Sequence, residues 1–143
     1  MTLVVDANLI SAIVLPLPYS EAARAKMARW KQEGEVIIAP VLWEYEVTSS
    51  LRMAIIHGLL DFEQAAGALQ RIMIMNVQSI PPTEDLHLEA LEWAGRLGQS
   101  LAYDSQYLAL AEQSGAELWT ADERLRNRAR QIGISWVRWV GEE

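Results

Sequence analysis

Acidic residues stand where an apolar run ends or a helical stretch begins, and their spacing could assemble carboxylate chemistry. Asp6 follows the apolar run 3–5, and Asp104 and Asp122 open two later helical stretches. Carboxylates crowded at one place repel each other, and a hard divalent cation such as Mg²⁺ or Mn²⁺ is their common counter-charge. Three or four acids around such an ion suit phosphoryl chemistry, because the metal activates water and stabilises the developing charge.

Each of these acids also has a purely structural explanation. Asp6 could cap the helix that follows it, since Asp is a favoured N-cap residue. A first-turn acid gains roughly 0.3–1 kcal/mol from the helix dipole, which could account for Asp104 and Asp122. Thr120 and Glu123 match the S/T-x-x-E capping box, which leaves Asp122 free in the first turn. The choice therefore depends on whether the acids reach one edge of the fold.

Two further acids, Glu44 and Glu46, compete for a place near this edge. They lie on a helical stretch after Pro40 that is apolar nearly all round. Positions two residues apart on an α-helix differ by about 200°, so both side chains cannot face the same cluster. Neither face is plainly polar, and periodicity leaves the choice open. The small residues Ser49 and Ser50 favour Glu46, because they would let its face approach a sheet closely.

The elements that must position these acids are short apolar strands separated by helices. Strands are predicted at 3–5, 35–39, 77–80, 117–119 and 134–140, and helices at 9–15, 20–32, 40–56, 61–75, 83–97, 104–113 and 122–131. This alternation predicts an α/β fold: a three-layer α/β/α sandwich with a central parallel sheet of about five strands. Ligands of such sheets collect at the carboxyl ends of the strands, where Asp6 lies.

Length and composition restrict the class of protein. A chain of 143 residues is expected to form a single domain, 1–143, with a real core. The absence of cysteine excludes disulfides and thiolate metal sites and is compatible with a reducing cytoplasm. No apolar run approaches the roughly 20 residues that span a bilayer, and the start lacks the features of a signal peptide. We therefore expect a cytoplasmic protein with no membrane contact.

Charge is unevenly distributed along the chain. The formal net charge of −7 argues against broad binding to a polyanion, because phosphate affinity comes from Lys and Arg. Residues 83–117 hold seven acids and one base, whereas residues 123–140 hold one acid and five arginines. The second segment predicts a local basic surface, on which Arg124 and Arg128 could hold the phosphates of a nucleic acid. A merely solvated helix face is the alternative for these arginines.

Four short motifs follow one another in an order that resembles a PIN-domain nuclease. They are Val4-Val5-Asp6-Ala7-Asn8, Pro40 six residues before Glu46-Val47, Tyr103-Asp104-Ser105-x-Tyr107-x-Ala109-Leu110-Ala111, and Thr120-x-Asp122-x-x-Leu125. Each motif alone is weak, but together they cover the full length of the chain. The likeness is greatest to the small VapC-like toxins of bacterial and archaeal toxin–antitoxin pairs.

The resemblance implies a site, an activity and partners. It implies that four acids hold Mg²⁺ or Mn²⁺, with two polar residues supporting them: Asp6, Glu46, Asp104 and Asp122, beside Asn8 and Thr120. The spacing of Glu46 from Pro40 in the resembled motif decides for Glu46 over Glu44. The activity implied is endonucleolytic cleavage of RNA. The partners implied are an RNA substrate and a cognate antitoxin, and we expect the chain to form a homodimer.

Other interpretations stay open at this point. The same fold could serve an RNA-processing nuclease without a toxin role, or a non-catalytic domain that binds a partner through its apolar helices. The presence of all four acids argues against the non-catalytic domain. A phosphatase or dehalogenase with a strand-end Asp nucleophile would favour a second acid two residues on and a later lysine. Asn8 occupies that second position, and no lysine follows Lys31.

Overall fold

Five parallel strands form the central sheet, in the order β3-β2-β1-β4-β5. The computed structural model describes residues 1–142, and its strands are β1 (Thr2–Val5), β2 (Val36–Pro40), β3 (Gln78–Ile80), β4 (Glu117–Thr120) and β5 (Val137–Trp139). The predicted parallel α/β architecture is thereby confirmed. The strand order reverses at β1: β2 and β3 extend the sheet on one side of β1, and β4 and β5 extend it on the other.

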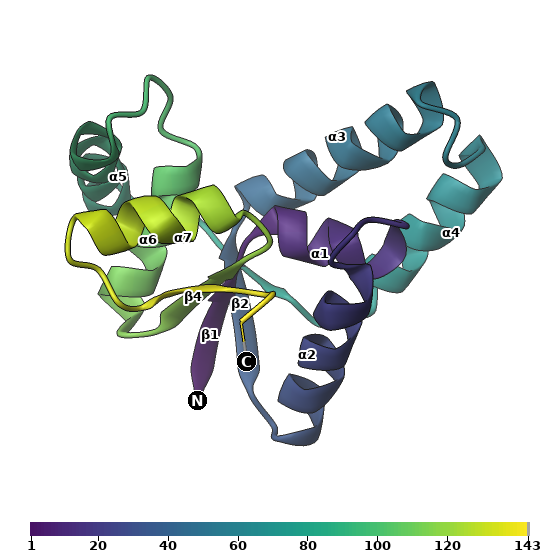
Figure 1. The fold of residues 1–143 in the computed structure, drawn as a ribbon, viewed down its shortest axis with the longest axis horizontal. Helices are drawn as coiled ribbons and strands as arrows, with labels where there is room; N and C mark the ends of the chain where they lie inside the picture. The colour runs from purple at the N-terminus through teal and green to yellow at the C-terminus, as the bar shows by residue number, and fades with distance from the viewer. Residues whose placement is uncertain (143) are drawn as a thin grey trace.

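Seven helices flank the sheet within these residues. They are α1 (Ala7–Val14), α2 (Ser20–Gln32), α3 (Leu42–Ile56), α4 (Phe62–Met73), α5 (Glu84–Leu97), α6 (Asp104–Ser114) and α7 (Glu123–Gln131). Figure 1 shows α1–α4 gathered on one side of the strands and α5–α7 on the other. Right-handed crossovers produce this division, because the chain crosses the sheet in one direction through β3 and then reverses. None of the described helices is both long and apolar enough to cross a membrane.

The packed core fixes the position of the carboxyl end of β1 and of the helix that begins beside it. Val4 and Val5 of β1 are fully buried, as expected of a strand covered on both faces. The apolar helix α6 packs against β1, β2 and β4, and five consecutive residues from Tyr107 to Ala111 are buried. Gly115 ends α6 with φ +61°, the left-handed conformation that glycine tolerates. The start of α6 is therefore held rigidly at the edge where β1 ends.

Most element boundaries shift by one or two residues from the sequence-based prediction, and two of the differences concern the sheet. Pro40 is the last residue of β2 rather than part of the following helix, and it pairs with Ile80 of β3. Pairing between β1 and β2 ends at Ile38, so the missing N–H of Pro40 breaks no ladder there. The predicted strand 134–140 shortens to the three residues of β5, because only these lie beside β4.

Candidate active site

The carboxyl ends of β1 and β4 bring Asp6 and Thr120 together. Val5 lies opposite Trp119 in the parallel register, and the residues that follow these two, Asp6 and Thr120, carry polar side chains. The Thr120 hydroxyl donates a hydrogen bond of 3.0 Å to Asp6 Oδ2, and Asp6 is only 3% exposed. Asp6 occupies the N-cap position of α1, yet its side chain makes no capping hydrogen bond. Helix capping therefore does not explain this buried carboxylate.

The Thr120 hydroxyl is the centre of a small polar network. Besides donating to Asp6, it accepts from the Asp122 backbone N–H at 3.0 Å and from Asn8 Nδ2 at 3.2 Å. Asn8 Oδ1 in turn accepts from the Ala121 N–H at 2.9 Å. A hydroxyl has one donor and two acceptor sites, so every site of Thr120 is used. The network fixes the turn after β4 against the start of α1.

The expected capping box between Thr120 and Glu123 is not formed. Asp122 itself is the N-cap of α7, and its Oδ1 accepts from the Arg124 N–H at 2.9 Å. Thr120 belongs to β4, and its hydroxyl is already bonded to Asp6. The prediction was wrong because sequence spacing alone does not reveal a side-chain bond to a distant strand.

Glu46 points from α3 towards α6, whereas Glu44 lies on another face of the same helix. The Tyr107 hydroxyl donates a short hydrogen bond of 2.6 Å to Glu46 Oε1, and Glu46 is half-buried. Glu44 is exposed, and the Ser79 hydroxyl donates to it at 3.4 Å. Ser49 shares one hollow with Glu46, as its small size suggested. The structure thus places Glu46 beside Asp6 and leaves Glu44 outside.

Asp104 begins α6, and a loop residue orients it. Gln99 Nε2 donates to Asp104 Oδ2 at 3.0 Å across the turn between α5 and α6. Neither Gln99 nor Tyr107 was singled out as a site residue from the sequence. A tyrosine on the otherwise apolar buried face of α6 was the available signal for Tyr107. Gln99 carries no signal, since a glutamine in a loop is ordinary.

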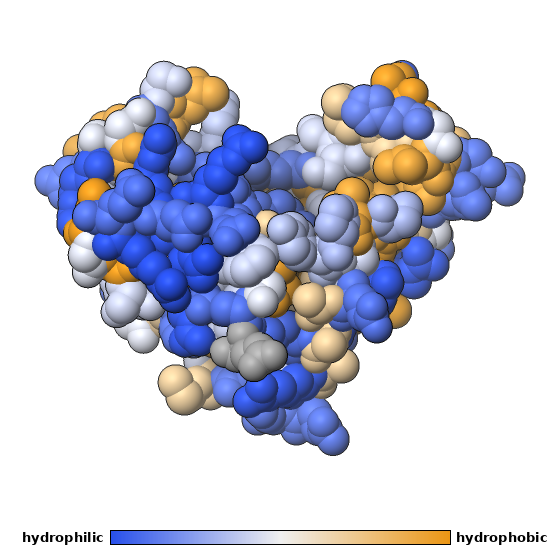
Figure 2. Space-filling view, viewed as in Figure 1, coloured by the Kyte–Doolittle hydropathy of each residue, from blue (hydrophilic) through white to orange (hydrophobic). Residues whose placement is uncertain are grey.

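Three of the four predicted acids line one hollow of about 400 Å³: Asp6, Glu46 and Asp104, together with Asn8. Figure 2 shows a recess in the molecular surface between the lobe formed by α5–α7 and the lobe formed by α3 and α4. Asp122 lines an adjacent hollow with Asn8 and Arg124. Among the residues that the structure describes, no three acidic or histidine side chains are arranged closely enough to hold a metal ion.

Electrostatics mark the hollow as a place that lacks a positive charge. Burial, helped by the charges of Asp104 and Glu46, raises the pKa of Asp6 from 3.8 to about 8, against the opposing effect of the Thr120 hydrogen bond. Burial likewise raises the pKa of Glu46 and that of Asp104. No Lys or Arg among residues 1–142 lines this hollow. These donors are carboxylate oxygens that repel one another, the kind that a hard divalent cation prefers, although the described side chains would have to draw closer together to hold one.

Comparison with known proteins identifies the family. The model of the PIN domain matches residues 3–131. The chain belongs to the PIN-domain family. Ribonuclease VapC3 of Pyrobaculum aerophilum is 29% identical over 129 residues, which cover 90% of this chain and 95% of that protein.

Solved structures share the fold of this PIN domain. VapC20 of Mycobacterium tuberculosis, described as a toxin that cleaves the sarcin–ricin loop, superposes with a TM-score of 0.65 at 17% identity, covering 95% of this chain and 98% of that chain. VapBC-1 from nontypeable Haemophilus influenzae gives a TM-score of 0.60 at 18% identity, covering 97% of this chain and 96% of that chain. At these identities the likeness shows the fold alone.

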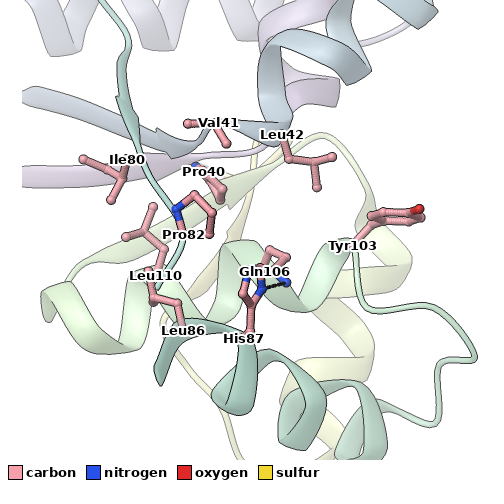
Figure 3. Close-up of a pocket in the computed structure, with 10 residues that line it drawn as sticks. All are labelled: Pro40, Val41, Leu42, Ile80, Pro82, Leu86, His87, Tyr103, Gln106 and Leu110. Carbon is pink, nitrogen blue, oxygen red and sulfur yellow. Dashed lines mark hydrogen bonds between the residues drawn. The ribbon is translucent and has the colours of Figure 1, made fainter. Parts of the chain in front are cut away.

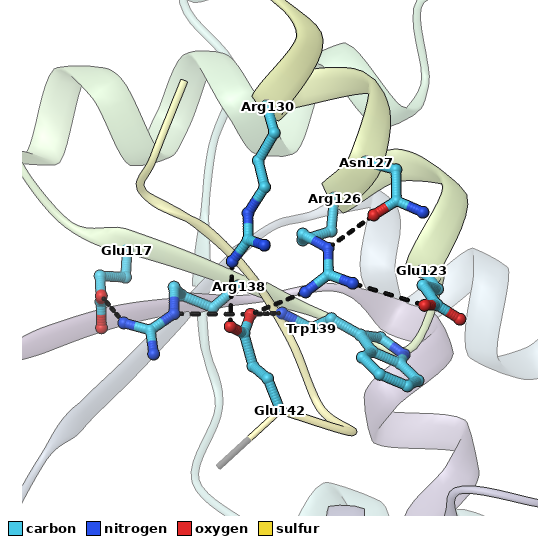
Figure 4. Close-up of polar contacts among 8 residues, drawn as sticks. All are labelled: Glu117, Glu123, Arg126, Asn127, Arg130, Arg138, Trp139 and Glu142. Atoms are coloured by element: carbon cyan, nitrogen blue, oxygen red, sulfur yellow. Dashed lines mark hydrogen bonds and ion pairs between the residues drawn. The ribbon is translucent and has the colours of Figure 1, made fainter. Parts of the chain in front are cut away.

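The basic surface expected over 123–140 is smaller in this PIN domain than the sequence indicated. Glu142 forms ion pairs with three of the five arginines in this segment, at 3.7 Å from Arg126, 3.2 Å from Arg130 and 3.5 Å from Arg138 (Figure 4). Arg124 and Arg128 are exposed on α7, and the structure of residues 1–142 assigns neither of them an ion pair. The basic surface is smaller than expected because Glu142, which lies beyond the basic segment in sequence, folds back onto it.

We expect Glu142→Gln to destabilise this PIN domain, because Arg126 would lose a charged partner while staying largely buried. Burial acts to raise the pKa of Glu142, but the Trp139 N–H and the three arginines outweigh it and lower that pKa. This stabilisation is present above the ordinary carboxyl pKa and is lost as the pH falls through the lowered value. Urea unfolding should show a loss of about 1–3 kcal/mol at neutral pH. Exposed Glu112→Gln is the control, and equal stability of both variants would contradict the prediction.

Proposed function

We propose that this PIN domain is a metal-dependent endoribonuclease. The observation that carries the proposal is the hollow where Asp6, Glu46 and Asp104 meet, which no basic side chain of the described residues lines. The hollow opens where strand order reverses, the usual position of ligands in open parallel sheets. The likeness to Ribonuclease VapC3 along 90% of the chain supports RNA as the substrate.

The residues proposed to hold Mg²⁺ or Mn²⁺ are the four predicted acids, Asp6, Glu46, Asp104 and Asp122. A bound divalent cation would supply activated water and would stabilise the charge that develops on the attacked phosphate. Thr120 fixes the rotamer of Asp6, and Tyr107 and Gln99 do the same for Glu46 and Asp104. Such fixed carboxylates would also orient the attacking water towards the phosphorus.

Substrate phosphates would be held beside the acids by the two arginines of α7 that make no ion pair within residues 1–142. Arg124 lines the hollow that contains Asp122 and Asn8, and Arg128 follows one turn later on α7. Both side chains are exposed, which leaves their charges available to a ligand. We therefore propose that these two arginines contact the RNA backbone and position it without reading its sequence.

A cognate antitoxin is proposed as the protein partner. The turn between α3 and α4 and the helix ends that adjoin it expose large apolar side chains: Met53, Ile56, Leu59 and Phe62. Figure 2 shows hydrophobic surface, in orange, over this part of the molecule. Exposed apolar surface of this kind marks interaction sites. The similarity of fold to the VapBC-1 structure supports a partner of this class. We propose that the partner covers this apolar surface and places a basic side chain near the acids. We also propose a homodimer, which sedimentation of the purified chain would test.

Cleavage of labelled RNA tests the proposed activity. The parent protein should cut single-stranded RNA in Mg²⁺ or Mn²⁺ and not in EDTA, and Asp104→Asn should lose this activity. Divalent cation should also raise the melting temperature, since binding only the folded state contributes about 2.7 kcal/mol at a hundredfold excess over Kd. Asp104→Asn should blunt that shift while it keeps the hydrogen bond from Gln99. Cleavage that continues in EDTA would refute the metal dependence, and no cleavage at all would refute the activity and favour a non-catalytic domain.

Overproduction in a bacterium tests the toxin role separately. The parent chain should arrest growth, and Asp104→Asn should not, because arrest by a ribonuclease requires cleavage. Colony counts after induction provide the measurement, with western blots to confirm equal amounts of both proteins. Normal growth with an enzyme that is active in vitro would assign this chain to RNA processing instead.

A further inference from the structure

A second pocket, of about 180 Å³, lies next to the carboxylate hollow. Figure 3 shows it between the start of α3 on one side and the starts of α5 and α6 on the other. Its walls are mostly apolar and come from segments far apart in sequence: Pro40, Leu42, Pro82, Leu86 and Leu110. Two residues, Leu42 and Tyr103, line both this pocket and the carboxylate hollow. The two spaces therefore adjoin at these residues.

The lining of the pocket selects an uncharged ligand. No Asp, Glu, Lys or Arg of the described residues lines it, so neither a phosphate nor a metal ion would find a counter-charge there. Tyr103 stands at the shared wall with 56% of its surface exposed, which leaves aromatic area free for stacking. Apolar walls beside an accessible aromatic ring suit a planar ring system.

A polar pair gives the pocket a hydrogen-bonding edge. Gln106 Nε2 lies 3.1 Å from His87 Nδ1, the contact drawn as a dashed line in Figure 3. An amide nitrogen can only donate, so His87 accepts at Nδ1 and a neutral ring carries its hydrogen on Nε2. That arrangement leaves one donor on His87 and one acceptor on Gln106 for a ligand. An apolar side chain from a protein partner would satisfy neither group.

We propose that this pocket binds one unpaired nucleobase of the RNA strand, next to the phosphate that is cleaved. The inference rests on the proposed ribonuclease activity and adds a specificity subsite to it. Proteins that read single-stranded RNA stack a splayed base on an aromatic side chain and bond its polar edge. Tyr103 would provide the stack, and the pair of His87 and Gln106 would bond the edge.

Abasic scanning of a short RNA tests this inference. A single-stranded oligonucleotide with one cleavage site is synthesised in versions that each lack the base at one position flanking the cut. For the parent protein, kcat/KM should fall roughly tenfold or more at one position, the scale of one lost stacking contact. Tyr103→Ala and Gln106→Ala should cleave the intact RNA more slowly and lose the sensitivity at that position only.

Matched controls separate the pocket from its surroundings. Leu101→Ala removes an exposed side chain from the same loop, and Gln113→Ala removes an exposed amide from the same helix, so both should keep the parent's abasic profile. A parent that cleaves RNA equally well with any base missing would overturn the inference while leaving the proposed activity intact. Unchanged profiles in the pocket variants would overturn it too, and loss of partner binding alone would assign the pocket to a protein. A parent that cleaves no RNA refutes the activity itself, and the inference with it.

Discussion

Asp6→Asn is expected to abolish RNA cleavage and, without divalent cations, to make the protein more stable at pH 8. Loss of activity follows from the proposed role, since the substitution removes a ligand charge from the hollow. The gain in stability follows from burial, which raises the pKa of Asp6 from 3.8 to about 8 with help from the charges of Asp104 and Glu46. Asparagine has nearly the same volume and can still accept the hydrogen bond from Thr120.

The direction of the pH dependence follows from linkage. A folded state with the higher pKa for Asp6 binds the proton more tightly than the unfolded chain does. The contribution of Asp6 to stability is therefore fully present below about pH 4 and is lost as the pH rises towards about 8. At about 1.4 kcal/mol per unit of pKa difference, the loss reaches several kcal/mol. The asparagine side chain has no proton to lose in this range, so the variant should escape this loss.

Thermal melts between pH 4 and 9 in EDTA measure the effect. The parent should lose stability with rising pH, and Asp6→Asn should melt roughly 5 °C or more above it at pH 8. Adding Mn²⁺ or Mg²⁺ should raise the parent's melting temperature and reduce the difference in melting temperature between the parent and Asp6→Asn. An Asp6→Asn protein that melts below the parent at pH 8 would show that the carboxylate is stabilised by the fold rather than strained by it. Undiminished cleavage would remove Asp6 from the site.

Local patterns were sufficient to predict most of the fold. Each of the five predicted runs became a strand, and the three inner strands β1, β2 and β4 are largely apolar because helices cover both of their faces. Helix ends were also predictable where one residue decides them, as with Thr83, whose hydroxyl caps the Leu86 N–H. Asp6 and Asp104 could be placed at one sheet edge because strand ends and helix starts meet there in any α/β fold.

Contacts between distant segments could not be predicted in the same way. The bond from Tyr107 to Glu46 joins residues 61 positions apart, and nothing local to either one specifies it. Thr120 appeared to be a helix cap, although its hydroxyl donates a hydrogen bond to Asp6, 114 residues earlier. The arginines after Asp122 looked free until the end of the chain brought Glu142 to three of the five basic residues in 123–140. In each case the partner is set by how distant elements pack against one another, which one sequence leaves undetermined.

Glu46→Gln is expected to lose most of the cleavage activity and to weaken metal binding, while Glu44→Gln stays within a few-fold of the parent. The two positions share a helix, but they differ in surroundings. Glu46 is half-buried, lines the hollow with Asp6 and Asp104, and accepts the 2.6 Å bond from Tyr107. Glu44 is exposed and contacts Ser79 outside that hollow. The pair therefore forms a matched comparison of the same chemical change.

Glutamine at position 46 should leave the fold unchanged, because its side-chain oxygen can still accept from the Tyr107 hydroxyl. Only the charge is removed, so the loss of kcat/KM should exceed the roughly 10–100-fold that residues supporting a metal site typically cost. Tyr107→Phe provides that smaller reference, since it removes the hydrogen bond and keeps the Glu46 charge. Cleavage rates over a series of Mn²⁺ concentrations separate weaker metal binding from slower chemistry. The reverse ranking, with Glu44→Gln inactive and Glu46→Gln near normal, would show that the other face of α3 serves the site.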